Sequence, residues 1–104
     1  MRKITKLAVQ SFLDRKEFQL SNTRVEADGG ESKLILFNRI IAVLDKNNNL
    51  LVSLGGYHFT RTTQERLNGL PGVRVNRSMG QNLLNGEAWD GKFIIANILE
   101  KSCK

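Results

Sequence analysis

The sequence predicts a small α+β domain, and three features of the chain support this. Its length of 104 residues fits a single domain, 1–104. Apolar residues near the N-terminus recur at helical spacing, whereas the later apolar runs are short and bounded by Gly- and Asn-rich turns. We therefore expect an N-terminal helix plus an antiparallel β-meander, a short helix near 62–69 and a C-terminal β-hairpin.

The N-terminal helix is predicted over residues 4–15. Lys6, Gln10 and Asp14 would face solvent, and Thr5 is a candidate N-cap. The apolar stripe that would face the rest of the domain consists of Ile4, Leu7, Ala8, Phe12 and Leu13.

The β-meander is predicted from apolar runs that cover residues 33–37, 40–45 and 50–54. Asn38-Arg39 would form the first connecting turn and residues 46–49 the second, because Asn tolerates the left-handed backbone conformation. Several of these runs are apolar at successive positions. Both faces of the sheet are therefore expected to be covered, one of them by the N-terminal helix.

The second helix is predicted from the segment TRTTQERLNGLPG, residues 60–72. Thr62 and Glu65 have the spacing of a capping box, in which each side chain accepts a hydrogen bond from the backbone amide of the other residue. Gly69 is expected to take the left-handed conformation just past the helix end, and Pro71 prevents the helix from continuing.

The C-terminal third predicts further strands. Residues 73–76 alternate between valine and polar residues, which is typical of a half-buried strand. The Asn-Gly pair at 85–86 favours a type I′ hairpin turn between residues 82–84 and 87–89. Residues 92–99 are a final apolar run, which fits a strand or a short helix.

Residues suited to catalysis or metal binding are scarce. His58 and Cys103 are the single histidine and cysteine and lie far apart in the chain, so no zinc site is predicted. The glycine-rich stretches match neither a phosphate-binding loop nor a nucleophile elbow. We therefore expect a protein that is not an enzyme and that holds no cofactor and no metal.

Two further features concern where the protein acts. No apolar run approaches the roughly 18 residues that cross a bilayer, and Lys6 and Gln10 interrupt the apolar stretch that a signal peptide requires. A single cysteine suits a reducing compartment. We expect a cytoplasmic protein that does not associate with membranes.

The charged and aromatic residues suggest a polyanionic partner. The chain has 16 Lys and Arg against 10 Asp and Glu, a net charge of +6, and residues 61–77 contain four arginines and one acid. Aromatic rings stack on bases, while guanidinium groups neutralise phosphates. We therefore predict binding to nucleic acid, single-stranded in particular, by Tyr57, His58, Arg61, Arg66, Arg74 and Arg77.

Three other interpretations fit the same residues. The cations can form an ordinary solvated surface, with Tyr57, Phe59 and Trp89 packed in the core. A basic face also suits a protein-interaction module that inhibits or redirects a host enzyme without catalysis. A thin core and exposed strand edges are compatible with a homo-oligomer.

A longer pattern resembles small proteins of tailed bacteriophages to which no function is assigned. It comprises GGY at 55–57, TTQERLNGLPGV at 62–73, LNG at 84–86 and WDG at 89–91. ITK at 4–6 and SNT at 21–23 fit as well, so the likeness covers most of the chain. The resemblance implies a virus-encoded protein of the host bacterial cytoplasm, and it assigns no catalytic or ligand-binding residue.

Overall fold

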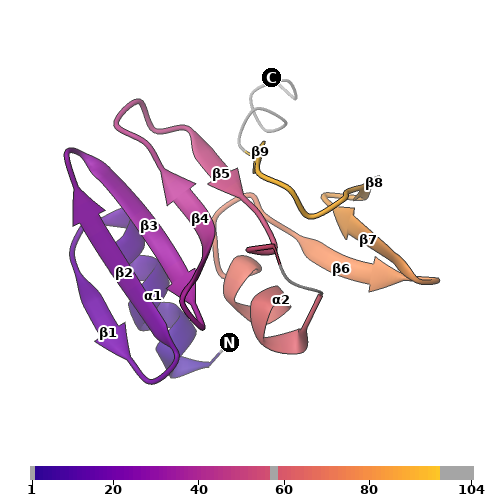
Figure 1. The fold of residues 1–104 in the computed structure, drawn as a ribbon, viewed down its shortest axis with the longest axis horizontal. Coiled ribbons are helices and arrows are strands. Elements are labelled where there is room, and N and C mark those ends of the chain that lie inside the picture. Colours follow the sequence, from indigo (N-terminus) through magenta and orange to yellow (C-terminus); the bar gives the residue numbers. More distant parts are fainter. Residues whose placement is uncertain (1, 57–58, 97–104) are drawn as a thin grey trace.

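The structure, a computed structural model, describes residues 2–56 and 59–96. Its larger sheet is antiparallel, with the strand order β1-β2-β3-β4-β5-β9 (Figure 1). Its strands are β1 (Phe18–Leu20), β2 (Thr23–Asp28), β3 (Glu31–Leu36), β4 (Arg39–Leu44), β5 (Leu50–Val52) and β9 (Ile94–Ile95). The predicted meander is confirmed as β3 to β5, and the final apolar run contributes a strand.

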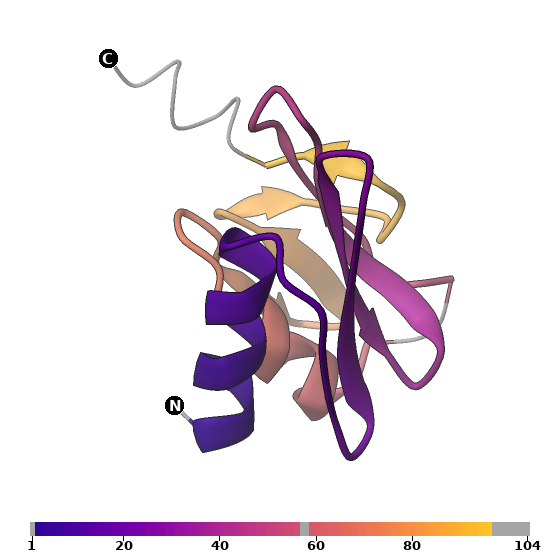
Figure 2. The ribbon, with the colours of Figure 1, turned by 90° about the vertical axis from the view of Figure 1, so that its left-hand side faces the viewer.

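Helix α1 (Lys3–Leu13) covers one face of this sheet (Figure 2). Its buried stripe is rotated from the predicted one, because Thr5 and Val9 are buried while Leu7 is 42% exposed. Thr5 lies inside the helix, so it is not the N-cap. That position belongs to Arg2, whose side chain makes no capping hydrogen bond.

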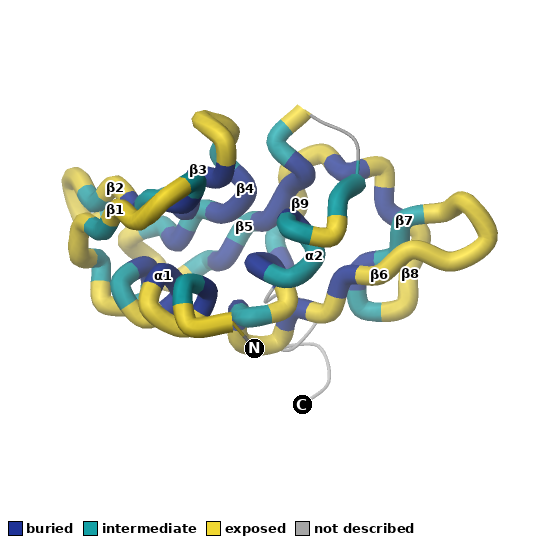
Figure 3. The backbone as a smooth tube through the Cα atoms, turned by 90° about the horizontal axis from the view of Figure 1, so that it is seen from below, coloured by how far each residue is buried: buried dark blue, intermediate teal, exposed yellow. Residues whose placement is uncertain are grey.

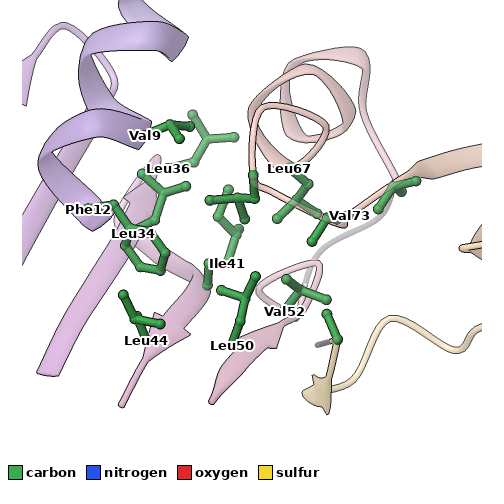
Figure 4. Packing of buried hydrophobic residues seen from close by; sticks show 14 of the residues in the cluster. Val9, Phe12, Leu34, Leu36, Ile41, Leu44, Leu50, Val52, Leu67 and Val73 are labelled. Atoms are coloured by element: carbon green, nitrogen blue, oxygen red, sulfur yellow. The ribbon is translucent and has the colours of Figure 1, made fainter. Parts of the chain in front are cut away.

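The core forms where α1, the large sheet and a second helix meet. Figure 4 shows Val9 and Phe12 of α1 packed near Leu34 and Leu36 of β3. Trp89 joins the same cluster and is only 8% exposed, which agrees with its interpretation as a core residue.

The turn between β3 and β4 consists of Phe37 and Asn38, one residue earlier than predicted. Leu36 pairs with Arg39 across it, and Phe37 and Asn38 have φ angles of +51° and +63°. Two successive residues with positive φ are typical of a type I′ turn, whose twist matches that of the hairpin. Asn tolerates this conformation, whereas a bulky side chain such as Phe rarely adopts it.

Helix α2 (Arg61–Leu67) confirms the predicted short helix but not its predicted cap. Thr60 is the N-cap, and its hydroxyl accepts a hydrogen bond from the Thr63 amide at 3.1 Å. The capping box of Thr62 and Glu65 is therefore wrong. Thr60 and Thr62 carry the same side chain two positions apart, so the local sequence does not distinguish them as caps.

The role predicted for Gly69 is also wrong. Gly69 is not among the glycines with positive φ. A Cβ atom at this position would lie 2.7 Å from Thr5 Cγ2 and 3.1 Å from Val9 Cγ2. A glycine is therefore required because α1 passes close to the end of α2, and not because the backbone is left-handed.

The smaller sheet follows α2 and contains β6 (Val75–Ser78), β7 (Gln81–Leu84) and β8 (Glu87–Ala88), in that order. Asn85 and Gly86 have φ angles of +52° and +86° and connect β7 to β8, which confirms the predicted type I′ turn. The Asn68 side chain attaches this sheet to α2. Its Oδ1 accepts from the Val75 amide at 2.6 Å, and its Nδ2 donates to the Val75 carbonyl at 3.1 Å.

Candidate functional site

The six predicted nucleic-acid-binding residues differ in how far the structure exposes them to solvent. Three of them are exposed: Arg61, Arg74 and Arg77. Arg66 is only 2% exposed, so the interpretation of its side chain as a surface cation is wrong. Tyr57 and His58 lie outside the described residues.

Arg66 is held inside the fold by hydrogen bonds to three elements. Its Nη1 donates to the Thr5 hydroxyl of α1 at 2.8 Å, and its Nε donates to the Thr23 hydroxyl of β2 at 3.0 Å. The same Nη1 forms an ion pair with the Glu65 carboxylate. A guanidinium committed in this way cannot also reach a phosphate in solvent.

Glu65 completes this network from its exposed side. Its carboxylate accepts from the Thr5 hydroxyl and, at 3.2 Å, from the Arg2 backbone amide. Burial by itself would raise the pKa of Glu65. The hydrogen bonds from Thr5 and Arg2 and the positive charge of Arg66 outweigh burial, so the pKa lies below its ordinary value.

Of the remaining predicted cations, Arg61 begins α2, Arg74 directly precedes β6 and Arg77 lies within β6. The ion pairs formed between described residues are Arg24–Glu26 and Arg66–Glu65, and neither of them includes Arg61, Arg74 or Arg77. The hairpin extends away from the body of the protein (Figure 1), and residues 76–81 at its outer end are exposed (Figure 3).

A cavity of about 520 Å³ lies between the β3–β4 turn and the start of α2. We call it the Phe37 pocket. The described residues that line it are Leu36, Phe37, Arg39, Ile41, Leu54, Thr60, Thr62 and Thr63. Its lining is mainly apolar, with a few hydroxyls and one cation, and its volume falls within the range of about 300–1,000 Å³ that is typical of small-molecule sites.

Local structure fixes the polar members of this pocket. Arg39 Nη1 donates to the Gly55 carbonyl at 3.2 Å, and a Cβ at Gly55 would lie 2.8 Å from the Arg39 Cβ. The hydroxyls of Thr60 and Thr63 share a hydrogen bond of 2.9 Å in the helix cap. The Thr62 hydroxyl has no hydrogen-bond partner in the described part of the chain.

Charge and motifs in the sequence do not indicate the Phe37 pocket. The apolar run 33–37 predicts Phe37 as the last residue of a strand, whereas it occupies a turn and is 60% exposed. The available signal was an aromatic residue directly before an Asn between two apolar runs, where the turn itself favours Asn or Gly.

These features define a small basic α+β protein. Each described helix is too short and too polar to span a membrane. In residues 2–56 and 59–96 we find no cluster of three or more His, Cys, Asp or Glu side chains that could hold a metal ion.

The family model of the Kyanoviridae Gp96 protein matches residues 1–92, and the chain belongs to this family of phage proteins. The expected phage family is thereby confirmed, while the specific motif pattern stays a prediction. No curated protein and no solved structure matches the chain.

Proposed function

We propose that this phage protein is an accessory factor that binds single-stranded nucleic acid in the host cytoplasm. The observation that carries the proposal is the exposure of Arg61, Arg74 and Arg77 on a chain of net charge +6. Among the described residues, none of these three arginines forms an ion pair. When Lys and Arg side chains contact a phosphate backbone, they release the counterions bound to it, and this release favours binding.

Single strands are the preferred partner because the surface also offers an aromatic ring. Phe37 is 60% exposed, and Arg39, two positions later in the sequence, lines the same pocket. Unpaired bases stack on such rings, whereas the bases of a duplex are already stacked on one another. Among the described residues, Phe37 therefore supplies the aromatic part of the proposed surface, while Tyr57 and His58 stay predictions.

The test compares two double variants with the same change in net charge. Arg61→Glu/Arg74→Glu alters the proposed surface, and Lys16→Glu/Lys46→Glu alters two exposed lysines in the loops that follow α1 and β4. Binding of a labelled oligo(dT) strand is measured by fluorescence anisotropy over a series of salt concentrations.

We expect affinity to fall steeply with salt for the unmodified protein and for the lysine control. For single strands, each phosphate contact contributes about −0.7 to the slope of log K against log salt. The arginine variant, which lacks two such contacts, should therefore have a slope that is shallower by about 1.4. Equal slopes for the two double variants would contradict the assignment of this surface. A protein that retains no oligonucleotide at low salt would contradict nucleic-acid binding as a whole.

A protein partner is the second candidate, and the hairpin of β6 and β7 favours it. Met79 at its tip has an exposed fraction of 102%, and residues 76–81 are exposed around it. A projecting hairpin with an apolar side chain at its tip suits insertion into a cleft of a partner. A nuclease-treated pull-down tests this. A stoichiometric host protein that is captured by the unmodified chain, but not by Met79→Asn, supports this function, and capture that is lost after nuclease contradicts it.

A further inference from the structure

The Phe37 pocket combines three properties that together restrict its ligand. Its apolar wall comes from β3, β4 and the segment after β5, through Leu36, Ile41 and Leu54, all of which are less than 6% exposed. These side chains are also part of the core, so the wall is rigid and preformed. Such a wall suits a flat apolar body and not a strongly hydrated group.

The second property is the exposed ring of Phe37 at the edge of the pocket. A φ of +51° is strained for Phe, and Asn or Gly would form the same type I′ turn more readily. The backbone conformation of the turn therefore does not explain why position 37 is Phe. Because Phe37 is 60% exposed, burial of the ring explains the choice only in part. A ring held in this position is available for stacking.

The third property is the polarity of the rim. Arg39 supplies a positive charge, and no acidic residue occurs among the described residues of the lining. Thr62 supplies a hydroxyl that can donate or accept, and Arg61 lies exposed between the two lining residues Thr60 and Thr62. The rim thus favours a ligand that carries an anion and has hydrogen-bonding groups on its edge.

We propose that the Phe37 pocket receives one unstacked nucleobase of a bound single strand. The ring of Phe37 stacks on the base, the Thr62 hydroxyl contacts the base edge, and the adjacent exposed Arg61 stabilises an adjoining phosphate. This inference rests on the proposed function and deepens it, because it assigns base contacts to a pocket beside the proposed cations.

The experiment compares two strands of equal length and charge. One is oligo(dT), and the other is a strand of abasic deoxyribose phosphates. Phe37→Asn removes the ring with a residue that suits the turn, Thr62→Val removes the hydroxyl, and Phe93→Asn is a control on an exposed ring outside the pocket. Affinities are measured at one fixed salt concentration.

We expect the unmodified protein and Phe93→Asn to prefer oligo(dT) over the abasic strand by roughly fivefold to a hundredfold, the range that stacking of one base provides. Phe37→Asn should lose most of this preference and Thr62→Val part of it. If the unmodified protein binds both strands with equal, salt-sensitive affinity, the assignment of the pocket as a base-binding site is wrong, and the proposed function stays intact. If neither strand binds, the proposed function itself fails, and the pocket assignment falls with it.

A second measurement does not depend on any variant. Thymidine 5′-monophosphate is titrated into the unmodified protein, and methyl NMR signals of Ile41 and Leu54 are followed. We expect these signals to shift with the nucleotide and not with deoxyribose 5-phosphate. Equal shifts with both compounds, or none at these methyls, would count against base binding in the pocket.

Discussion

The guanidinium of Arg66 donates to the hydroxyl of Thr5 at 2.8 Å, across 61 residues of sequence. Its Nε donates to Thr23 at 3.0 Å, so this one side chain joins α2 to both α1 and β2. Arg66 is 2% exposed, and buried polar groups are costly when they lack partners. The most basic segment of the chain therefore contains an arginine whose role is structural.

Replacement of Arg66 by methionine should destabilise the protein strongly. Arg66→Met keeps much of the side-chain volume but leaves Thr5, Thr23 and Glu65 without their common donor. We expect the free energy of unfolding, measured with urea, to fall by about 3 kcal/mol.

The matched control for this prediction is Arg61→Met in the same helix. Arg61 is exposed, so the change should stay within about 0.5 kcal/mol. Similar losses for the two variants would show that Arg66 does not have the structural role described here.

Stability should also depend on pH through Glu65. The pKa of Glu65 is lower in the folded protein than in the unfolded chain, so the folded state favours the charged carboxylate. The resulting stability is fully present above the unfolded pKa of about 4.3 and is lost as the pH falls through the lower folded pKa. We expect Glu65→Gln to reduce the loss of stability between neutral and acidic pH in thermal unfolding.

Part of the pH dependence should persist in Glu65→Gln. Hydrogen bonds from the amides of Asn49 and Asn47 and from the Asn49 side chain lower the pKa of Asp45 despite partial desolvation, and this acts in the same direction. Glu87→Gln, at an exposed position of β8, is the control. An acid-induced loss that is the same in Glu65→Gln and in Glu87→Gln would argue against the assigned role of Glu65.

The sequence predicted features that follow from strong local preferences, and it missed contacts between residues far apart in the chain. The turn at Asn85 and Gly86 follows from the backbone preferences of the two residues and appeared where expected. Arg66 was misassigned because its partners Thr5 and Thr23 come from other elements, and no local pattern marks them. The contacts of Glu65 with Arg2 and Thr5 were missed for the same reason, whereas the capping box failed locally because Thr60 and not Thr62 caps α2.

Close packing of the two helices gives a third prediction. A methyl group at Gly69 would lie 2.7 Å from Thr5 Cγ2 and 3.1 Å from Val9 Cγ2. Gly69→Ala should therefore lower the free energy of unfolding by about 1–3 kcal/mol, as expected for overpacking, although alanine restricts the unfolded chain more than glycine does.

Gly80→Asn is the comparison for Gly69→Ala. Gly80 has a φ of +78°, which Asn tolerates better than other side chains, and nothing lies within 4 Å of a Cβ placed there. We expect a much smaller effect in urea unfolding. If Gly69→Ala instead stabilises the protein, α1 and α2 are not in the close contact described.

The last prediction concerns the turn residue Phe37. A positive φ costs a residue with a large side chain about 1–2 kcal/mol, and Asn recovers part of this through local hydrogen bonds. Removal of the ring also forfeits the contacts of its buried part, but Phe37 is 60% exposed, so this loss is limited. We expect Phe37→Asn to raise the free energy of unfolding by about 0.5–1 kcal/mol.

Asn38→Ala provides the opposite control in the same turn. Asn38 has a φ of +63° and accepts a hydrogen bond from Arg24 Nη1 at 2.6 Å, so its replacement should lower stability by about 1 kcal/mol. A Phe37→Asn protein that is more stable but no longer prefers strands with bases would show that the ring serves the ligand at the expense of the turn. A Phe37→Asn protein that is clearly less stable would instead identify Phe37 as a packing residue, and the strain at this position would then need no functional explanation.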